Sequence, residues 1–489
     1  MDVDADVVIV GYGPVGQLAA NLLGAARLRT LVLERSPALH PLPRAAAIDD
    51  EGLRILQAAG VAEQARAEML PDVPVAFVTR RGREVRLVDA ADTPNGHPFV
   101  SLLHQPALER VLDAAARARP CVDVRFGVEV VAVEQDASGV AFALADGSAV
   151  TARYLVACDG GRSPTREALG VAFGGSTFAE SWLVVDLLLD APRAEAPVMR
   201  FLGDPGRPKV SVPTGERRHR WELMALPGED HAAMPAQVRE LLAPHADLAR
   251  ADIERATIYT YHARTAARWR SGRVLLAGDA AHVMPPFAGQ GMCSGLRDVH
   301  NLAWKLAAVI RDGADPVLLD TYEQERRPHV EAMSRLAVRM GSVLQTRRPR
   351  AAVLRDGVLR ALSEAPGLGP RARSGSLRPT SRYRTGAFGP GGGRLFGQPL
   401  ITGVPLDDVL GAGRWALLGA GRDPHAALVP EAQATFADAA SLAVDPALLG
   451  GADLVVLRPD RFVFAVDDAA GAFAAAAYRR HVEGAGLDG

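Results

Sequence analysis

The residues with the clearest chemical meaning stand near the N-terminus, where Gly11, Gly13 and Gly16 form a GxGxxG pattern. Backbone amides at this spacing can approach a phosphate closely, because glycine has no Cβ atom. About twenty residues further on, Glu34 offers a carboxylate that can accept hydrogen bonds from ribose hydroxyls. Together these residues predict a site for a dinucleotide.

The sequence on either side of these residues predicts the strands and the helix that position them. The apolar run Asp6–Val10 predicts a strand, and helical periodicity follows from Pro14 and Val15 to about Ala26. A second apolar run, Thr30–Leu33, ends just before the acidic residue. The GxGxxG pattern alone is a weak signal, and its place between the strand and the helix of a βαβ unit makes it a strong one.

A second glycine-rich loop follows the apolar run Val274–Ala277 and precedes a helical stretch that places Leu302, Leu306 and Val309 on one face. Asp279 stands where the strand ends. The other residues of interest in this loop are Gly278, Pro285, Pro286, Gly289, Gly291 and Met292. Bare amides at a helix N-terminus suit an anionic or electron-rich ligand. The alternative is a tight turn that needs glycine for a positive φ.

Composition restricts the class of protein. The 489 residues are 48% hydrophobic and carry a formal net charge of −2, which argues against a nucleic-acid platform or a basic membrane surface. No apolar run reaches the length of a membrane-spanning helix, and we expect no signal peptide and no membrane partner. Three scattered cysteines, Cys121, Cys158 and Cys293, favour a cytoplasmic protein with reduced thiols. No Cys/His cluster has metal-ligand spacing, so we expect no metal.

The two glycine-rich stretches together resemble the flavoprotein aromatic hydroxylases, the single-component FAD monooxygenases typified by p-hydroxybenzoate hydroxylase. Tyr154–Ser163, YLVACDGGRS, resembles the DG motif of that family. Tyr259–Leu306 and Pro41–Gly60 are most similar to the 3-(3-hydroxyphenyl)propionate hydroxylase branch, whose scaffold also serves polyketide oxygenases. The likeness covers residues 5–345 well and the last hundred or so poorly.

The resemblance implies that FAD lies along the GxGxxG turn, that Asp279 contacts its ribityl chain, and that the backbone around Pro286, Gly291 and Met292 lies against the isoalloxazine ring. The full set of expected cofactor-binding residues is Gly11, Gly13, Pro14, Val15, Gly16, Glu34, Arg35, Arg44, Gln105, Asp159, Gly278, Asp279, Pro286, Gly289, Gly291 and Met292.

Several of these residues have a plain alternative role. Arg44 can be a surface arginine, Gln105 an ordinary helix start, and Asp159 the cap of the turn that follows it. Two weak catalytic candidates are also open. His262 stands just upstream of the flavin loop, with a structural histidine as the alternative, and Phe287 either faces a pocket or packs in the core.

The predicted fold class is α/β, with a Rossmann-like FAD-binding domain, an inserted antiparallel-sheet substrate domain and a thioredoxin-like C-terminal domain. The expected divisions are the FAD-binding domain at 1–170 and 263–345, the substrate domain at 171–262, a linker at 346–393 and the C-terminal domain at 394–489. No cysteine follows Cys293, so the last domain cannot perform dithiol chemistry, and we expect a structural or dimer-forming role.

Three finer expectations concern the C-terminal half. Asp315–Met340 is expected to form a helical pair around Pro316 and Pro328. Arg347–Gly393, which is rich in Arg, Pro, Gly and Ser, is expected to be a linker. Ala472–Val482 is expected to form a helix.

The function implied by the resemblance is hydroxylation of a phenolic or polyketide aromatic substrate through a flavin C4a-hydroperoxide, with O2 and NADPH or NADH as transient co-substrate. The rivals are a halogenase, an NAD(P)H oxidase, a nicotinamide dehydrogenase and a non-catalytic flavin-binding protein. A halogenase would carry a WxWxIP pattern and an essential lysine. The tryptophans here never pair that way, and the only lysines, Lys209 and Lys305, are badly placed.

Overall fold

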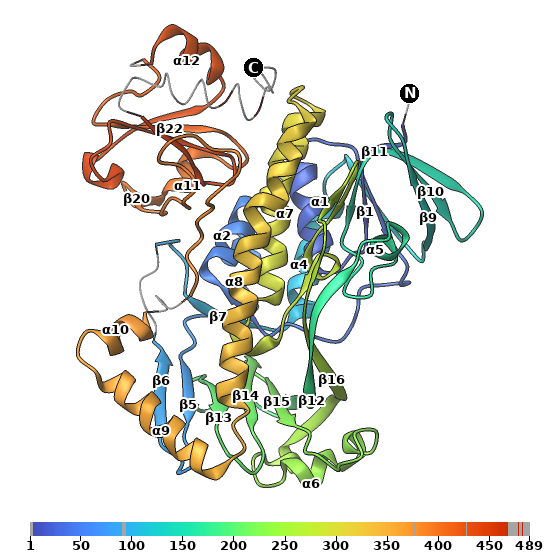
Figure 1. Ribbon diagram of the computed structural model, residues 1–489, viewed down its shortest axis with the longest axis vertical. Helices are drawn as coiled ribbons and strands as arrows, with labels where there is room; N and C mark the ends of the chain where they lie inside the picture. Colours follow the sequence, from blue (N-terminus) through green and yellow to red (C-terminus); the bar gives the residue numbers. More distant parts are fainter. Residues whose placement is uncertain are drawn as a thin grey trace.

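The computed structural model describes residues 3–89, 94–374, 378–426 and 428–467, together with Tyr478 and Val482. Three larger sheets organise the chain (Figure 1). The first is built on the N-terminal strand, the second lies below it in the view, and the third belongs to the C-terminal part. The long helix α8 (Asp320–Leu344) runs from the level of the first sheet to that of the second.

The first sheet has a parallel core, assembled from segments that are far apart in the sequence, and antiparallel strands at β17 and at the β9–β10 branch. Its main path is β17-β18-β11-β1-β2-β8, and β1 is parallel to both β2 and β11. The bounds are β1 Ala5–Val10, β2 Thr30–Glu34, β8 Val122–Phe126, β11 Ala149–Ala157, β17 Arg270–Ser271 and β18 Val274–Leu276. The hairpin β9 (Val130–Gln135) and β10 (Val140–Leu144) branches from β11. Helix α1 (Pro14–Ala25) links β1 to β2, so the predicted βαβ unit is present.

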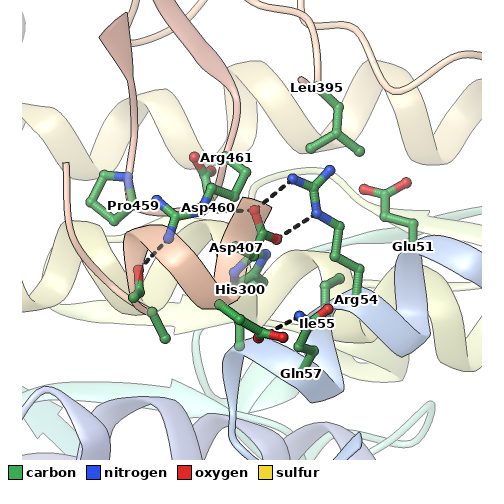
Figure 2. Close-up of a pocket in the computed structure, with 14 residues that line it drawn as sticks. Glu51, Arg54, Ile55, Gln57, His300, Leu395, Asp407, Pro459, Asp460 and Arg461 are labelled. Atoms are coloured by element: carbon green, nitrogen blue, oxygen red, sulfur yellow. Dashed lines mark hydrogen bonds and ion pairs between the residues drawn. The ribbon is translucent and has the colours of Figure 1, made fainter. Parts of the chain in front are cut away.

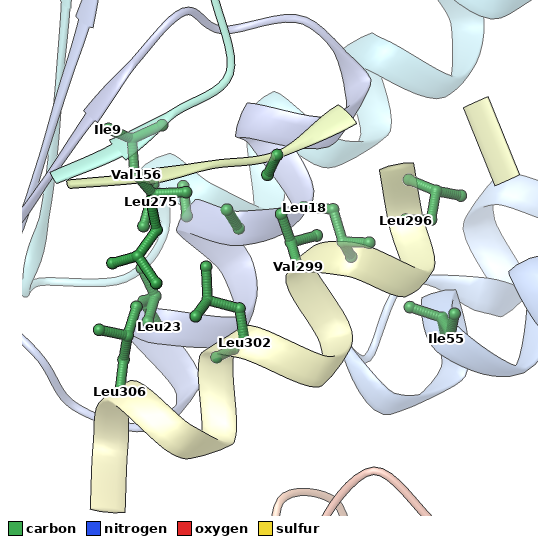
Figure 3. Packing of buried hydrophobic residues seen from close by; sticks show 14 of the residues in the cluster. Ile9, Leu18, Leu23, Ile55, Val156, Leu275, Leu296, Val299, Leu302 and Leu306 are labelled. Carbon is green, nitrogen blue, oxygen red and sulfur yellow. The ribbon is translucent and has the colours of Figure 1, made fainter. Parts of the chain in front are cut away.

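The core of this part lies between the sheet and two helices. Figure 3 shows Leu18 and Leu23 of α1 against Leu302 and Leu306 of α7 (Gly291–Ile310), with strand residues such as Val156 above them. All of these side chains are buried. The inward face predicted for α7 is therefore confirmed, and it anchors the helix whose first turn follows the second glycine-rich loop.

The second sheet has the order β19-β16-β12-β15-β14-β13-β5-β6. Two long neighbours, β12 (Phe173–Leu189) and β16 (Ala251–Ala266), form its backbone. The other bounds are β5 Val75–Val78, β6 Glu84–Val88, β13 Met199–Leu202, β14 Lys209–Gly215, β15 Arg218–Met224 and β19 His282–Val283. The predicted strands of residues 171–262 pair antiparallel, and β5, β6 and β19 join them from outside that range, β5 in parallel with β13.

Smaller elements connect these sheets. A three-stranded sheet has the order β3-β7-β4. The bounds are β3 Ala47–Asp49, β4 Met69–Leu70, β7 Val100–Leu103, α2 Asp50–Ala58, α3 Ala62–Ala67, α4 Gln105–Arg117, α5 Pro164–Ala168 and α6 Val238–Leu242. Asp49 caps α2 by accepting a hydrogen bond from the Gly52 amide at 2.8 Å, as expected for an N-cap aspartate.

One proline-based expectation is wrong. The predicted helical pair is one helix, α8, with Pro328 inside it. Burial of Val330 and Met333 holds this helix against its neighbours, so packing overrides the lost backbone hydrogen bond. The expected linker contains α9 (Pro349–Glu364) and α10 (Leu368–Arg373). Pro349 occupies the first turn of α9, where proline starts a helix and does not break it.

The C-terminal sheet has the order β23-β22-β24-β25 and mixes parallel and antiparallel pairs. Its bounds are β22 Ala416–Ala420, β23 Ala440–Val444, β24 Leu454–Leu457 and β25 Val463–Asp467. Around it lie β20 Leu400–Ile401, β21 Val404–Pro405, α11 Leu406–Leu410 and α12 Pro430–Thr435. The expected helix at Ala472–Val482 lies outside the described residues, apart from Tyr478 and Val482. The thioredoxin-like character of this part stays a prediction.

Within the described ranges, no helix is both long enough and apolar enough to cross a membrane. Among the same residues, no group of three or more His, Cys, Asp or Glu side chains is arranged to hold a metal ion.

Candidate active site

Two cavities meet where the first and second sheets face each other. One, of about 480 Å³, follows the β1–α1 turn, the end of β2 and the start of α5. The other, of about 420 Å³, lies between the second glycine-rich loop and the face of the second sheet. They share five lining residues, Gly13, Arg44, Cys158, Gly160 and Tyr259. A long ligand with two distinct halves fits such a pair of adjoining cavities.

The glycines of the first turn divide into two kinds. A Cβ atom on Gly16 would lie 2.1 Å from the carbonyl oxygen of Gly11, and one on Gly11 would lie 2.5 Å from that of Cys158. These two glycines therefore allow the close packing of strand and helix. A Cβ atom on Gly13 would meet no described atom within 4 Å, because Gly13 faces the cavity. The open backbone at Gly13 is the surface that a pyrophosphate needs.

Glu34 stands fixed at the wall of the first cavity. Its Oε2 accepts a hydrogen bond from the Tyr12 amide at 2.7 Å, and its Oε1 accepts one from the Ser36 amide at 2.8 Å. A carboxylate has further lone pairs, so Glu34 can still accept from a ligand hydroxyl. Arg35 lines the same cavity and is exposed.

Asp159 caps the turn that follows it, as its sequence position suggested, and its second carboxylate oxygen stays a candidate for cofactor binding. Its Oδ2 accepts a hydrogen bond from the Thr165 amide at 3.0 Å, which stabilises the following turn. Its Oδ1 is buried and has no partner among the described residues. A buried acceptor of this kind at a cavity wall fits a ligand that brings its own donor.

The second glycine-rich loop delivers Asp279 to the cavity between the sheets. Burial by the surrounding protein raises the pKa of its carboxyl, while Arg44 and His282 act in the opposite direction. Gly291 begins α7, and a Cβ atom there would meet no described atom within 4 Å. The N-terminus of a long helix therefore opens onto the cavity, where it favours negative charge. Pro286, Gly289 and Met292 line the same cavity.

Arg44 and Gln105 are linked. The Gln105 side-chain oxygen accepts hydrogen bonds from the amides of Arg44 and Ala45 at 3.0 and 2.5 Å, and its Nε2 donates to Glu109 at 2.6 Å. Gln105 lines the cavity, but its amide holds the Arg44 loop in this structure. The Arg44 side chain lines both cavities.

Aromatic rings form one end of the cavity between the sheets. Phe287 is only 3% exposed and packs at ring-centroid distances of 5.7 Å from Trp182 and 5.8 Å from Tyr261. It belongs to the core of the second sheet and also lines the cavity. The two roles that the sequence offered for Phe287 are thus both present.

The opposite end of this cavity is charged. Asp186 lies between Arg220 and Arg255 as their direct cross-strand neighbour, with distances of 2.7 and 2.6 Å to the two guanidinium groups. Arg220 also donates to the carbonyl oxygens of Arg44 and Pro43, at 2.7 and 2.8 Å. The sheet is therefore tied to the loop that carries Arg44.

Glu222 and Tyr261 lie between the aromatic and the charged end. The Tyr261 hydroxyl donates to Glu222 Oε2 at 3.4 Å, and both residues line the cavity. Burial raises the pKa of Glu222, and Arg220 only partly offsets that effect. Val184 and Val210 are its cross-strand neighbours. A carboxyl in such surroundings exchanges a proton closer to neutral pH than an exposed one.

Sequence reasoning missed Asp186, Arg220, Glu222 and Arg255. The only local signal was their spacing by two along predicted strands, which places Arg220 and Glu222 on one face. The same alternation places the His262 side chain away from this cavity and favours the structural alternative for it. It is adjacent to Tyr261 and points to the other face, where its Nδ1 bonds the Thr177 hydroxyl at 3.0 Å. His262 is not among the residues that line the cavity.

Comparison with known proteins agrees with this geometry. Residues 4–337 match the FAD binding domain family. The chain is 38% identical over 517 residues to a 3-(3-hydroxy-phenyl)propionate/3-hydroxycinnamic acid hydroxylase of Burkholderia vietnamiensis, covering 95% of this chain and 94% of that protein. It is 39% identical over 449 residues to a hydroxylase of the same name from a Mycobacterium species, covering 87% and 78% of the two chains.

Solved structures give the same result. Aklavinone-11 hydroxylase with FAD and aklavinone superposes with a TM-score of 0.80 at 27% identity, over 99% of both chains. The anhydrotetracycline hydroxylase OxyS from Streptomyces rimosus has a TM-score of 0.80 at 29% identity, over 98% of this chain and 99% of that one.

The chain belongs to the FAD binding domain family. Within it, the protein is an FAD-dependent aromatic hydroxylase, which confirms the resemblance to the flavoprotein aromatic hydroxylases. FAD has the two halves that the adjoining cavities require. The open backbone at Gly13 and Gly291, and the free acceptor on Asp159, fit such a ligand.

Proposed function

We propose that this protein uses NADPH or NADH and O2 to hydroxylate a small phenolic compound of the hydroxyphenylpropionate type. One observation carries the proposal. The cavity along the β1–α1 turn adjoins the cavity between the sheets, which has an aromatic end, a charged end and the Glu222–Tyr261 pair between them. The higher identity to the hydroxyphenylpropionate hydroxylases, 37–39% against 27–29% for the two polyketide hydroxylases, favours the smaller substrate.

In this proposal FAD is held by residues of both glycine-rich stretches. The amides around Gly13 bind the pyrophosphate, Glu34 binds the adenosine ribose, and Asp279 accepts from the ribityl hydroxyls. The start of α7 at Gly291 faces the ring and favours negative charge on it. When bound, FAD supplies the redox and oxygen chemistry, which no side chain can supply.

The chain's own residues then position the phenol and move its proton. Phe287 and Tyr261, which line the cavity, pack on the ring and exclude water from the aromatic end, and Trp182 supports Phe287 from behind. The Glu222 carboxylate accepts the phenolic proton, directly or through the Tyr261 hydroxyl that donates to it. The substrate oxygen thereby becomes a stronger electron donor to the ring.

The nicotinamide nucleotide acts as a transient co-substrate in this proposal. The sequence holds one complete dinucleotide pattern, and FAD takes that site. NADPH or NADH therefore binds only long enough to transfer a hydride, at a surface from which it can reach the flavin in the two adjoining cavities.

Oxidation of NADPH and NADH by the purified holoprotein tests the proposal, with a panel of phenols and mass analysis of the product. We expect hydroxyphenylpropionates to stimulate oxidation and to gain one oxygen atom. If only anhydrotetracycline-like or anthracyclinone compounds stimulated the oxidation of NADPH or NADH, the substrate would be a polyketide and not a small phenol. Nucleotide oxidation that no phenol or polyketide stimulates, with no hydroxylated product, would contradict the proposal.

A further inference from the structure

A buried cluster of charges lies behind the start of α7, and the proposed chemistry does not use it. Asp49 is its hub. Asp49 Oδ2 accepts hydrogen bonds from Gln290 Nε2 and from Arg378, each at 3.0 Å, and also from Arg297. Although burial opposes ionisation, Arg297 and Arg378 hold the pKa of Asp49 well below its usual range. Asp49 is therefore a charged group in the interior whose position depends on its cationic partners.

The cluster reaches the cofactor cavity through Gln290. Gln290 is only 5% exposed, and its two neighbours, Gly289 and Gly291, line that cavity. Its side-chain oxygen accepts from Arg297 at 3.1 Å while its Nε2 donates to Asp49. Both ends of the Gln290 amide are thus held from behind the cavity wall. The turn at Gly289 has a φ of +64°, so the Gln290 side chain next to it is well placed to fix the turn from behind.

Arg378 comes from a different part of the chain. It lies beyond residue 337, where the match to the FAD binding domain family ends. Besides Asp49, it pairs with Asp50 at 2.8 Å, and its guanidinium lies 4.8 Å from the centre of the Phe99 ring. The C-terminal third of the chain therefore supplies a cation to the cluster that holds the cavity turn.

We propose that Arg378 is a positioning residue for the cofactor site, acting through Asp49 and Gln290 on the Gly289–Gly291 turn. The inference rests on the proposed placement of the flavin ring against that turn. Loss of Arg378 leaves Asp49 with one cation fewer and leaves Asp50, which is also buried, without its charged partner. Gln290 then loses its fixed acceptor, and the turn gains freedom that FAD binding must remove.

Another ionic link offers a matched control. Arg54 of α2 donates to both carboxylate oxygens of Asp407 in α11, at 2.6 and 2.9 Å, and both side chains are buried. Figure 2 shows Arg54 extending toward Asp407 at the wall of a separate cavity of about 220 Å³. This link also joins the C-terminal part to α2, but neither residue lines the cofactor cavity. Its loss should loosen the same interface without touching Gln290.

The test compares Arg378→Met, Arg378→Lys and Arg54→Met in the full chain. Apoprotein is titrated with FAD, and hydrogen exchange of the peptides around residues 285–292 is measured in the apoprotein. We expect Arg378→Met to raise the FAD dissociation constant about tenfold or more, since a hydrogen bond to a charged group is lost, and to speed exchange in the turn. Arg378→Lys should restore part of the affinity, and Arg54→Met should leave it within about twofold of the parent.

Gln290→Ala decides whether the effect travels through Gln290. If it does, adding Arg378→Met to Gln290→Ala should change the dissociation constant little further, because Arg378 and Gln290 share Asp49 and residues in one hydrogen-bond network couple. Should Arg378→Met fail to fold, Arg378→Lys and Gln290→Ala alone give the same comparison. Equal affinities for Arg378→Met and Arg54→Met, or additive effects in the double variant, would overturn the inference. If the Gln290→Ala variant bound FAD normally and the absorption spectrum of the bound flavin were unchanged, the result would instead count against the placement of the flavin ring at this turn.

Discussion

Glu222 lies between apolar cross-strand neighbours and Arg220, and its ionisation decides whether it can accept a proton. Burial raises its pKa above the ordinary 4.5. A base that must be ionised loses activity as the pH falls. The loss of kcat/KM on the acid side should therefore have its midpoint above pH 4.5. The charged groups that face it are Arg220 on the same strand, Asp186 on β12 and Arg255 on β16, and the hydroxyls of Tyr259 and Tyr261 on β16 are neutral neighbours.

We expect Glu222→Gln to lower kcat/KM for a phenol by roughly 100-fold or more and to remove that acid limb, because general-base catalysis contributes on this scale. A phenol that is already ionised at neutral pH should lose much less. Steady-state rates over a pH series with the two substrates give the answer. An acid limb that survives in the variant would assign the proton to another group.

Phe287 offers a second prediction at the same scale, because it both packs in the core and lines the cavity. Phe287→Leu should keep FAD bound but admit water to the aromatic end, so more of the NAD(P)H consumed should yield hydrogen peroxide. Phe287→Ala should in addition lower stability by about 3–5 kcal/mol, the usual cost of emptying a buried aromatic site. Peroxide and product are measured per NAD(P)H consumed. An unchanged ratio in the leucine variant would leave Phe287 with its packing role alone.

At the scale of elements, the glycines of the β1–α1 turn have two different roles. Gly11 and Gly16 allow close packing of the backbone, whereas Gly13 faces the cavity. We expect Gly16→Ala to destabilise or unfold the protein, because its Cβ atom would collide with the Gly11 carbonyl oxygen. Gly13→Val should fold, since nothing described lies within 4 Å of its Cβ position, yet it should lose FAD. Thermal unfolding of both apoproteins and retention of flavin after gel filtration distinguish them. Retention of FAD by the valine variant would exclude the pyrophosphate from this turn.

Elements with a local signature were predictable from the sequence. The βαβ unit and α7 follow from short-range periodicity and glycine spacing, and both are present. Pro328 led to a wrong prediction, because it is tolerated inside α8, where packing outweighs the lost backbone hydrogen bond. The charged end of the cavity was missed because Asp186, Arg220 and Arg255 meet only through strand register. No pattern within one segment encodes such a pairing.

At the scale of the whole molecule, buried charges join the C-terminal part to the FAD-binding part. Glu325 of α8 is completely enclosed and pairs with Lys305 of α7 at 2.9 Å and with Arg458 at 2.7 Å. The Ala387 amide also donates to it, at 2.8 Å. Although burial opposes ionisation, Arg458 and Lys305 lower the pKa of Glu325 to about 2. One carboxylate thus holds two cations from two parts of the chain.

Removing that carboxylate should cost much of the stability of the molecule. We expect Glu325→Gln to lower the free energy of unfolding by about 3–5 kcal/mol, because Lys305 would stay buried without this carboxylate and Arg458 would keep only Asp460 as its ion-pair partner. Glu331→Gln, on the same helix but 41% exposed at its side chain, should change it by less than about 0.5 kcal/mol. Because the folded-state pKa lies below the ordinary 4.5, the contribution of Glu325 is present above pH 4.5 and disappears as the pH falls through about 2. Urea unfolding of parent and variants at pH 7 and pH 4.5 should therefore show the same deficit for Glu325→Gln, and a deficit that vanished already at pH 4.5 would mean that Glu325 is not held ionised by Arg458 and Lys305.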